Sequence, residues 1–382
     1  MYQFYDMQTT IHTESNQYSV KILISRITFL LFILLGFLIS LKLMSYGFEA
    51  FGDEAAKNLI YTYATSPVIS LFIGLLATAI TQSSSLTTSI VVSLMASGQF
   101  NSVADAVPLI IGANIGTSIT STIVSMGHMG NRKEFNKAIS AATVHDFFNL
   151  IVTIVIFPLE LAFNFLSNLA IFLEETFFSA IVISPEASTS SFSPIKESAK
   201  FVHEIFDNGY ITLIIAFVAL FFSLKYLSKI LKALFIGNNK EKFEARVFGS
   251  PIKSMFWGVG LTAAVQSSSV TTSLTVPLVA TNVVSLQKAF PFLLGANIGT
   301  TITALIASLS NPSDGAISIA FVHILFNLIG VSIFMLIPYF QKLPIFLAQW
   351  IGEITLKRRW YGFAYILTVF FIIPVFLIAI IK

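Results

Sequence analysis

The chain of 382 residues has no cysteine and few charged residues. Without cysteine there is no disulfide, no thiolate–metal site and no cysteine nucleophile. Only 11% of the residues are charged, against roughly a quarter in soluble globular proteins. The formal net charge of +3 is too small to indicate a nucleic-acid partner. These absences exclude an ordinary soluble enzyme and a nucleic-acid-binding protein.

Long apolar segments take the place of the missing charges. Segments of roughly 20 apolar residues, at about 1.5 Å per residue, are long enough to cross a hydrocarbon core of roughly 30 Å. They predict an all-α polytopic protein of the plasma membrane, or of the inner membrane in a bacterium. The first 20 residues lack the basic start of a secretory signal peptide, so we expect the first segment to be retained. The apolar segments cover residues 27–47, 67–97, 106–127, 138–163, 209–235, 254–281, 289–309, 315–340 and 361–381.

Two of these segments are interrupted at their centres by polar runs. Residues 67–97 contain Thr81-Gln-Ser-Ser-Ser85, and residues 254–281 contain Val265-Gln-Ser-Ser-Ser269. Non-helical backbone at membrane depth is tolerated where it is buried in protein or lines a water-filled cavity. We therefore predict that each segment forms a re-entrant helical hairpin rather than a simple crossing.

The two interrupted segments belong to an internal duplication. The run Gln82-SSSLTTSIVV matches Gln266-SSSVTTSLTV at an offset of 184 residues, and Gly112-ANIGTSIT matches Gly295-ANIGTTIT at an offset of 183. Downstream, Val144-His145 pairs with Val322-His323. Each half is therefore predicted to hold one leading helix, one hairpin and two further spans.

Loop charges predict that the second half is inverted. Lys and Arg gather in residues 128–137 and 225–253, which indicates that these loops are cytoplasmic. If the hairpins do not cross, each half crosses three times, and the second half enters the membrane upside down. Asp105 and Lys288 occupy aligned positions in the two halves. Inversion then places Asp105 on the exterior side and Lys288 on the cytoplasmic side, in agreement with their charges. Inverted repeats with broken helices are typical of secondary transporters, whose site lies where the repeats meet.

The predicted organisation has five parts. A cytoplasmic N-terminal tail and a C-terminal segment with one further span flank the two repeats, which an exterior segment connects. The ranges are 1–26 for the tail, 27–165 for repeat 1, 166–207 for the connecting segment, 208–340 for repeat 2 and 341–382 for the C-terminal segment.

The hairpin tips carry hydroxyls and amides but no charge. Asp105 is the only charged residue in 67–127, and Lys288 the only one in 254–310. Serine hydroxyls at the start of a helix, together with its unpaired N–H groups and dipole, bind anions. We predict an anion cradle without Arg or Lys, in which a co-bound cation compensates the charge. The predicted anion ligands are Ser83, Ser84, Ser85, Asn114, Ser267, Ser268, Ser269 and Asn297.

Asp146 is the remaining candidate, because a carboxylate inside a membrane segment is costly. With Asn149 one turn later, it is placed to coordinate a cation. Each candidate also has a structural interpretation. Asp146 at the membrane interface would face water, and the matched His145 and His323 are interpreted as structural rather than as proton carriers. Ser and Thr in membrane helices also form hydrogen bonds within their own helix or between neighbouring helices.

These motifs together resemble the type II sodium-dependent phosphate cotransporter family. The resemblance covers residues 68–340, through the paired QSSS runs, the two GANIGT runs and Val144-His145-Asp146-Phe147-Phe148-Asn149. It implies sodium-driven uptake of inorganic phosphate by elevator-like alternating access, with the hairpin tips meeting at the site. Sodium is then a co-substrate, the bilayer is a partner, and neither a cofactor nor an enzymatic reaction is expected.

The resemblance also implies roles for individual residues. The tip serines would bind phosphate. Gln266, Thr300 and Thr303 would form one sodium site, Asn149 would join another, and Asp146 would make transport of divalent phosphate electrogenic. The predicted sodium ligands are Gln82, Thr122, Asp146, Asn149, Gln266, Thr300 and Thr303.

The chain departs from the animal pattern at two positions. Asn131 and Ala296 stand where animal members have an acidic residue and a serine, so the sodium count stays open. The short cysteine-free segment 184–208 points to a bacterial member. The alternative function is a sodium-coupled symporter of another small oxyanion or a dicarboxylate. The sequence contains no charged pore ring of the kind expected of an anion channel. The oligomeric state is left open, and a homodimer is one option.

Overall fold

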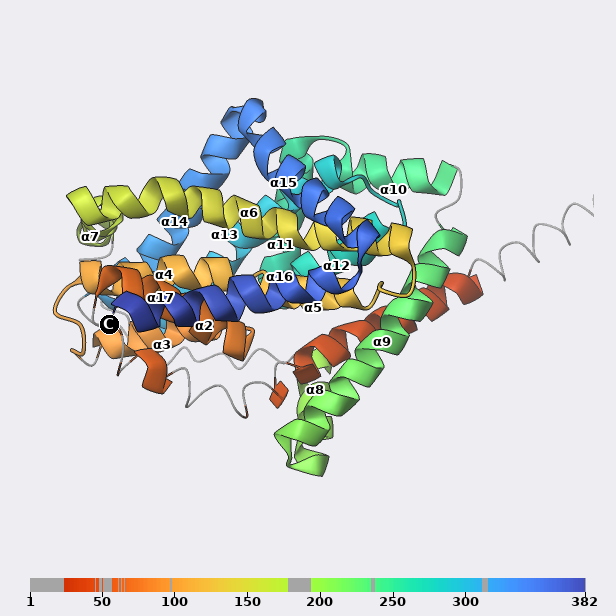
Figure 1. Cartoon of the computed structure of the whole chain (residues 1–382), viewed down its shortest axis with the longest axis horizontal. Helices are drawn as coiled ribbons and strands as arrows, with labels where there is room; N and C mark the ends of the chain where they lie inside the picture. Colours follow the sequence, from red (N-terminus) through yellow and green to blue (C-terminus); the bar gives the residue numbers. More distant parts are fainter. Residues whose placement is uncertain are drawn as a thin grey trace, which may run out of the picture.

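The computed structural model is helical throughout the part of the chain that it describes (Figure 1). It describes residues 24–44, 46–47, 50, 57–60, 62, 64, 66–96, 98–177, 194–234, 238–310 and 315–381. Seven helices in these residues are long and apolar enough to cross a membrane, which confirms a polytopic all-α chain. They are Ile24–Met44, Val103–Met126, Arg132–Phe163, Gly209–Leu231, Leu286–Ile306, Ala316–Leu336 and Trp360–Ile381. The predicted N-terminal tail lies outside the described residues up to position 23.

The two duplicated halves hold corresponding sets of helices. The first half contains α2 (Pro67–Thr81), α3 (Ser84–Ala96), α4 (Val103–Gly116), α5 (Ile119–Met126) and α6 (Arg132–Phe163). The second half contains α11 (Pro251–Val265), α12 (Ser268–Ala280), α13 (Leu286–Ser310) and α14 (Ala316–Leu336). The other helices are α7 (Phe165–Phe177), α8 (Pro194–Phe206), α9 (Gly209–Leu234), α10 (Asn238–Phe248), α15 (Pro338–Lys357), α16 (Trp360–Leu367), η1 (Thr368–Ile372) and α17 (Ile373–Ile381).

Each interrupted segment folds as two short helices around a two-residue joint. Helices α2 and α11 both have 15 residues and begin with Ser-Pro, where the Ser66 or Ser250 hydroxyl accepts a backbone N–H of the first turn. Both helices end at a glutamine in the left-handed region, Gln82 at φ 53° and Gln266 at φ 54°. The duplication in sequence is therefore also a duplication of caps and backbone angles.

Glycines bring the helices of each half into backbone contact. A Cβ added to Gly74 or Gly112 would lie 2.1 or 1.9 Å from a backbone oxygen across the α2–α4 contact. A Cβ added to Gly258 or Gly295 would lie 2.0 or 1.9 Å from one across the α11–α13 contact. The glycines of the GANIGT runs thus hold the helices that precede the tips in place.

The ends of α13 lie at opposite ends of the bundle from the matching ends of α4 and α5. Just before α13, Asn282 accepts a hydrogen bond from Lys137, which follows α5 in the chain. Just after α13, a Cβ on Gly315 would lie 3.4 Å from the side chain of Val103, the first residue of α4. Helix α13 therefore runs antiparallel to the α4–α5 span.

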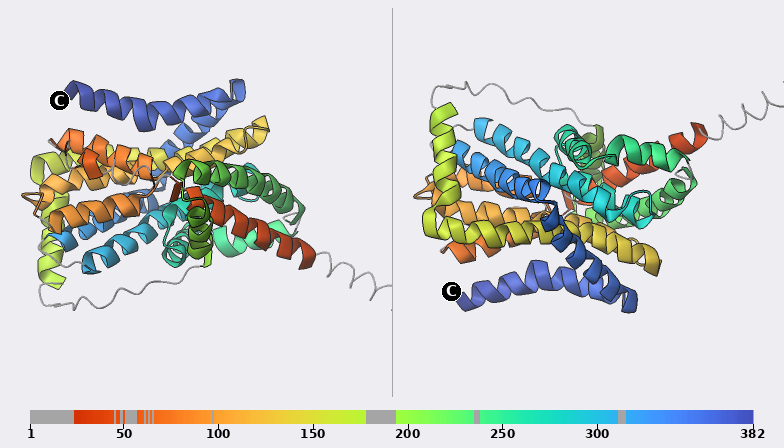
Figure 2. Two further views of the ribbon diagram at one scale, coloured as in Figure 1. Left: turned by 90° about the horizontal axis from the view of Figure 1, so that it is seen from below. Right: turned by 90° about the horizontal axis from the view of Figure 1, so that it is seen from above.

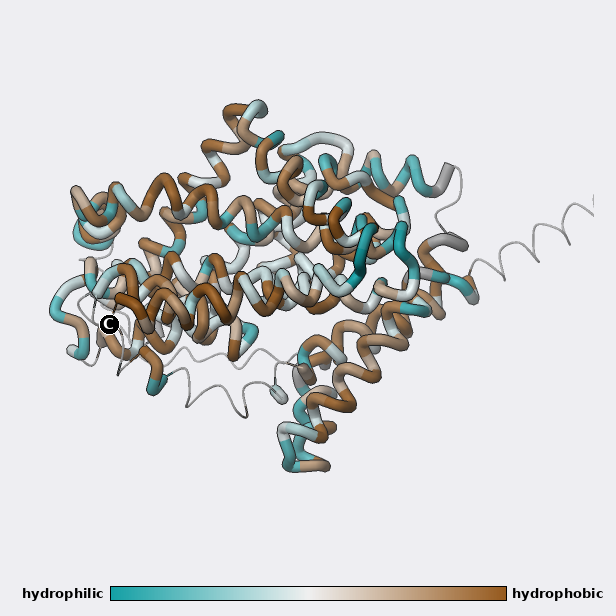
Figure 3. The backbone as a smooth tube through the Cα atoms, viewed as in Figure 1, coloured by the Kyte–Doolittle hydropathy of each residue, from teal (hydrophilic) through white to brown (hydrophobic). Residues whose placement is uncertain are grey.

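The first span and α9 lie side by side at one end of this bundle (Figures 1 and 2), where α9 contacts α12. The rings of Phe29 and Tyr226 meet edge to face, with centroids 6.3 Å apart. Helix α7 runs across the end of α6 (Figure 2), and hydrophobic residues dominate the long helices while hydrophilic ones gather near their ends (Figure 3). The predicted terminal span is present as α16–η1–α17.

Helices α7, α8, α10 and α15 are additions to the predicted organisation. These four segments mix polar and apolar residues and contain no apolar run long enough to predict a span. Their buried faces form only on packing, as for α15, which lies along α6.

Candidate anion and cation site

The two QSSS tips line one small pocket. Its volume is about 70 Å³, and Ser269 Oγ lies 3.5 Å from the carbonyl oxygen of Gln82, to which it donates. The lining residues are Leu41, Lys42, Gln82, Ser83, Ser84, Ser85, Thr120, Gln266, Ser267, Ser268, Ser269 and Val270. Segments 184 residues apart in the chain are thus joined into a single polar site.

The first serine of each tip caps the helix that follows. Ser83 Oγ accepts the N–H of Leu86 at 3.2 Å, and Ser267 Oγ accepts the N–H of Val270 at 3.3 Å. The other N–H groups of each first turn have no acceptor within their own helix. The tips therefore present two positive helix ends and the two later serines of each run to the pocket.

The two tips differ in exposure. Gln82 is 3% exposed and its Oε1 has no hydrogen-bond partner among the described residues, whereas Gln266 is exposed. Thr120 is also buried, with an unpartnered hydroxyl on the pocket. Buried polar atoms are normally hydrogen-bonded, so these two oxygens are free to bind a ligand.

The expectation of a cradle without Lys or Arg is wrong in one residue. Lys42, on the first span, is half-buried and lines the pocket. Its Nζ lies 4.9 Å from the centre of the Tyr46 ring. The signal in the sequence was a lysine within the apolar segment 27–47, but nothing local indicates that this segment meets the tips.

Asn114 and Asn297 lie outside the pocket lining, in a buried network that joins the halves. His145 Nε2 lies 2.5 Å from Asn297 Oδ1, and His323 Nε2 lies 3.2 Å from Asn114 Oδ1. Asn149 accepts from Asn297 Nδ2 at 3.0 Å and donates to the carbonyl oxygen of Asn114 at 2.7 Å. Each matched histidine thus pairs with the asparagine of the opposite half, as a structural role requires.

The threonines among the predicted sodium ligands bond within their own helices. Thr122 Oγ1 donates to the carbonyl oxygen of Ser118 at 3.0 Å, and Thr300 Oγ1 donates to that of Ala296 at 3.0 Å. Such bonds are the structural alternative for membrane threonines. The side chain of Thr303 lies outside the described part of the chain.

Asp146 is buried on α6 and has a partner that no sequence motif indicates. The Tyr365 hydroxyl on α16 donates to Asp146 Oδ2 at 2.8 Å. Asp146 Oδ1 is buried without a partner among the described residues. Tyr365 carries no local signal for this role, because the contact joins residues 219 positions apart.

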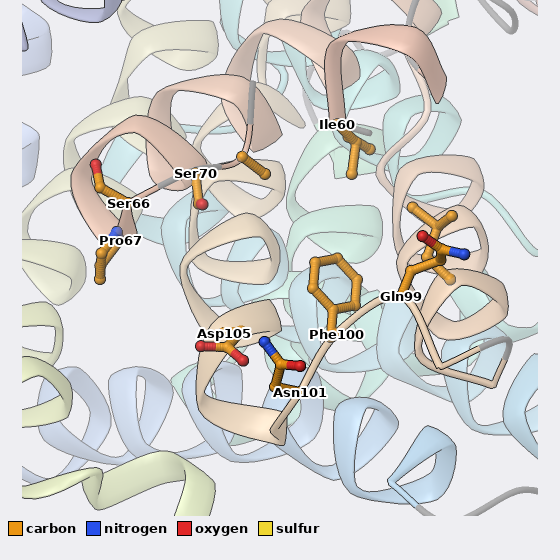
Figure 4. A pocket seen from close by; sticks show the side chains of 10 residues that line it. Ile60, Ser66, Pro67, Ser70, Gln99, Phe100, Asn101 and Asp105 are labelled. Atoms are coloured by element: carbon orange, nitrogen blue, oxygen red, sulfur yellow. The ribbon is translucent and has the colours of Figure 1, made fainter. Parts of the chain in front are cut away.

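Two larger cavities in the described part of the chain lack the predicted ligands or have a mainly apolar lining. A pocket of about 270 Å³ at the ends of α2 and α4 is lined by Ser66, Ser70, Asn101 and Asp105, among others (Figure 4). The Asp105 carboxylate accepts the N–H of Ser102 at 3.0 Å as part of a helix cap. A mainly apolar cavity of about 840 Å³ adjoins Gln82. The paired tips therefore remain the best candidate site.

Seven apolar helices in the described part of the chain and a polar pocket built from duplicated segments define a multi-pass membrane protein. A family model described as Na+/Pi-cotransporter matches residues 36–173 and 219–354. The chain belongs to this family. Each matched stretch contains one QSSS tip, in agreement with the duplication.

Curated relatives carry matching descriptions. The chain is 31% identical to sodium-dependent phosphate transport protein 2B of Homo sapiens, over 92% of the chain and 64% of that protein. It is 31% identical to protein 2A of Rattus norvegicus, over 90% of the chain and 66% of that protein. The chain thus spans slightly less than two thirds of these relatives. No solved structure matches it.

Proposed function

We propose that the chain is a sodium-coupled symporter that imports inorganic phosphate. The observation that carries the proposal is the meeting of two QSSS tips, 184 residues apart in sequence, in one pocket. Family membership supports it, as do the names of the relatives, which are sodium-dependent phosphate transport proteins.

Phosphate is held between the two helix N-termini by Ser83–Ser85 and Ser267–Ser269. A helix N-terminus carries roughly half a positive charge, so two of them attract an anion. The pocket of about 70 Å³ is small, which suits a compact oxyanion better than an extended dicarboxylate. Asn114 and Asn297 contribute through the network that joins the halves behind the site.

Sodium ions bind at hydroxyl, amide and carboxylate oxygens near the tips and on α6. Hard cations prefer such oxygens. The proposed ligands are Gln82, Thr122, Asp146, Asn149, Gln266, Thr300 and Thr303. Sodium at Asp146 makes import of divalent phosphate carry net positive charge inward.

The tips belong to re-entrant hairpins in two inverted repeats. Helices α2 and α11 have 15 residues and α3 and α12 have 13, which gives lengths of about 20–22 Å. These lengths fall short of the roughly 30 Å needed to cross. The antiparallel course of α4–α5 and α13 supports inversion, and alternating access moves the paired tips between the two sides.

Labelled-phosphate uptake into proteoliposomes tests the proposal. An inward sodium gradient should drive accumulation, and replacing sodium with choline should abolish it. Uptake that is unchanged in choline contradicts sodium coupling. If excess sulfate or succinate inhibits uptake more strongly than unlabelled phosphate does, the substrate is another oxyanion or a dicarboxylate.

Variants connect this activity to the tips. Ser268→Ala removes a hydroxyl that would bind a charged ligand, a contact worth about 1.5–3 kcal/mol, so phosphate affinity should fall roughly 10- to 100-fold. Gln266→Ala should raise the sodium requirement. The control is Ser273→Ala on the same helix, because the Ser273 hydroxyl is buried without a partner among the described residues and lies outside the pocket lining. Equal phosphate uptake by Ser268→Ala and by the control would contradict the assignment of the tips to the phosphate site.

A further inference from the structure

We propose that Lys42 supplies a fixed positive charge to the substrate pocket and thereby favours doubly charged oxyanions. This inference rests on the proposed function, since it concerns the same pocket. Lys42 lies in the apolar span Ile24–Met44, outside both interrupted segments, and lines the pocket between their tips. A lysine within a membrane span is costly unless it is paired or reaches water.

No acidic residue neutralises Lys42 within the part of the chain that the structure describes. None of the described ion pairs involves it, and no Asp or Glu lines the pocket. The Tyr46 ring, 4.9 Å from Nζ, stabilises the ammonium by a cation–π contact without cancelling its charge. The local structure thus keeps an unneutralised charge at the pocket.

The rest of the lining offers donors to an anion and acceptors to a cation. Two helix N-termini and the later tip serines present donors, while Gln82 Oε1 and Thr120 Oγ1 are buried acceptors without partners among the described residues. An ammonium strengthens binding of a dianion more than of a monoanion, because the Coulomb attraction scales with ligand charge. It also repels sodium, so its presence divides the pocket between an anion end near Lys42 and cation ligands elsewhere.

Lys42 is carried by the span that packs on α9, whereas the tips belong to the duplicated bundle. The charge therefore comes from a helix outside the two interrupted segments that supply the hydroxyls. Any movement of the tips relative to this span changes the distance between lysine and anion. Lys42 thus acts in the conformation in which the tips face the first span.

The test compares Lys42→Gln, Lys42→Arg and the control Lys229→Gln, which changes an exposed lysine on α9. For Lys42→Gln we expect the half-saturating phosphate concentration in uptake to rise about tenfold, while the half-saturating sodium concentration stays the same or falls. Lys42→Arg keeps the charge and should stay within about threefold of wild type. The control should match wild type.

A lysine that merely anchors the span at the membrane surface predicts a different pattern. Lys42→Gln would then keep wild-type phosphate affinity, and this result overturns the proposal. So does an equal loss in Lys42→Arg and Lys42→Gln, which would indicate a packing role.

Equilibrium binding of labelled phosphate to the purified full chain separates this inference from the proposed function. Sodium-independent uptake by the wild type would contradict the proposed symport. Weaker phosphate binding by Lys42→Gln would still support the lysine's role, and unchanged binding would refute it.

Discussion

At the scale of the residue, Asp146 combines burial with an incomplete set of partners. Tyr365 satisfies Oδ2 at 2.8 Å, and Oδ1 is buried without a partner among the described residues. A buried acceptor without a donor costs about 1–3 kcal/mol. A sodium ion at Oδ1 would offset that cost, which agrees with the proposed cation role.

Asp146→Gly is expected to keep phosphate uptake and to lose the transport current. If the carboxylate holds one sodium ion, as proposed, its removal takes that ion out of the cycle, and divalent phosphate then enters with one positive charge fewer. The measurement is charge moved per phosphate in voltage-clamped cells. Asp105→Asn, which alters an exposed carboxylate at a helix start, should leave the ratio unchanged. An undiminished ratio in Asp146→Gly would refute the assigned role.

Local sequence predicts some of these residue environments and not others. The duplication predicts that the two QSSS runs meet, because matched segments of two repeats come together at the interface between them. The capping role of Ser83 and Ser267 depends on where each helix begins, which the run of three serines leaves undecided. Lys42 and Tyr365 depend on long-range packing, for which neither has a local signal.

At the scale of the element, apolar length predicts the long spans to within a few residues. The span predicted at 209–235 is α9, Gly209–Leu234, and that at 289–309 is α13, Leu286–Ser310. The length of apolar segments does not predict helices α7, α8, α10 and α15, because amphipathic helices gain their stability from packing. The glycines of the GANIGT runs lie at backbone contacts between helices.

Helix α11 offers a matched test of that packing. A Cβ on Gly258 would lie 2.0 Å from the Phe292 carbonyl oxygen, whereas a Cβ on Gly260 would meet nothing within 4 Å. Gly258→Ala should therefore destabilise the protein by about 1–3 kcal/mol or more and displace the second tip, with loss of uptake. Gly260→Ala should be neutral or stabilising by up to about 1 kcal/mol. Thermal unfolding in detergent and phosphate uptake report both effects, and equal melting temperatures for the two variants would contradict the packing account.

At the scale of the whole molecule, the two halves interlock in opposite directions. His145 and His323 reach across to Asn297 and Asn114, and α13 runs antiparallel to α4–α5. If the halves are inverted repeats, as proposed, each side of the membrane meets an equivalent arrangement of helices around the tips. Such symmetry would allow the same pocket to open alternately to either side.

The absence of cysteine makes the inverted topology directly measurable, because a single introduced thiol has no background. Asn101 and Gln287 are exposed near the starts of the matched helices α4 and α13. In inverted repeats, a membrane-impermeant maleimide added to intact cells should label Asn101→Cys, and should label Gln287→Cys only after permeabilisation. Parallel repeats would place both thiols on the same side, and labelling of both from outside would exclude inversion. Uptake by each variant must first match wild type, so that the labelling pattern describes the working transporter. Inverted labelling would then explain how the two halves of one chain form a single site.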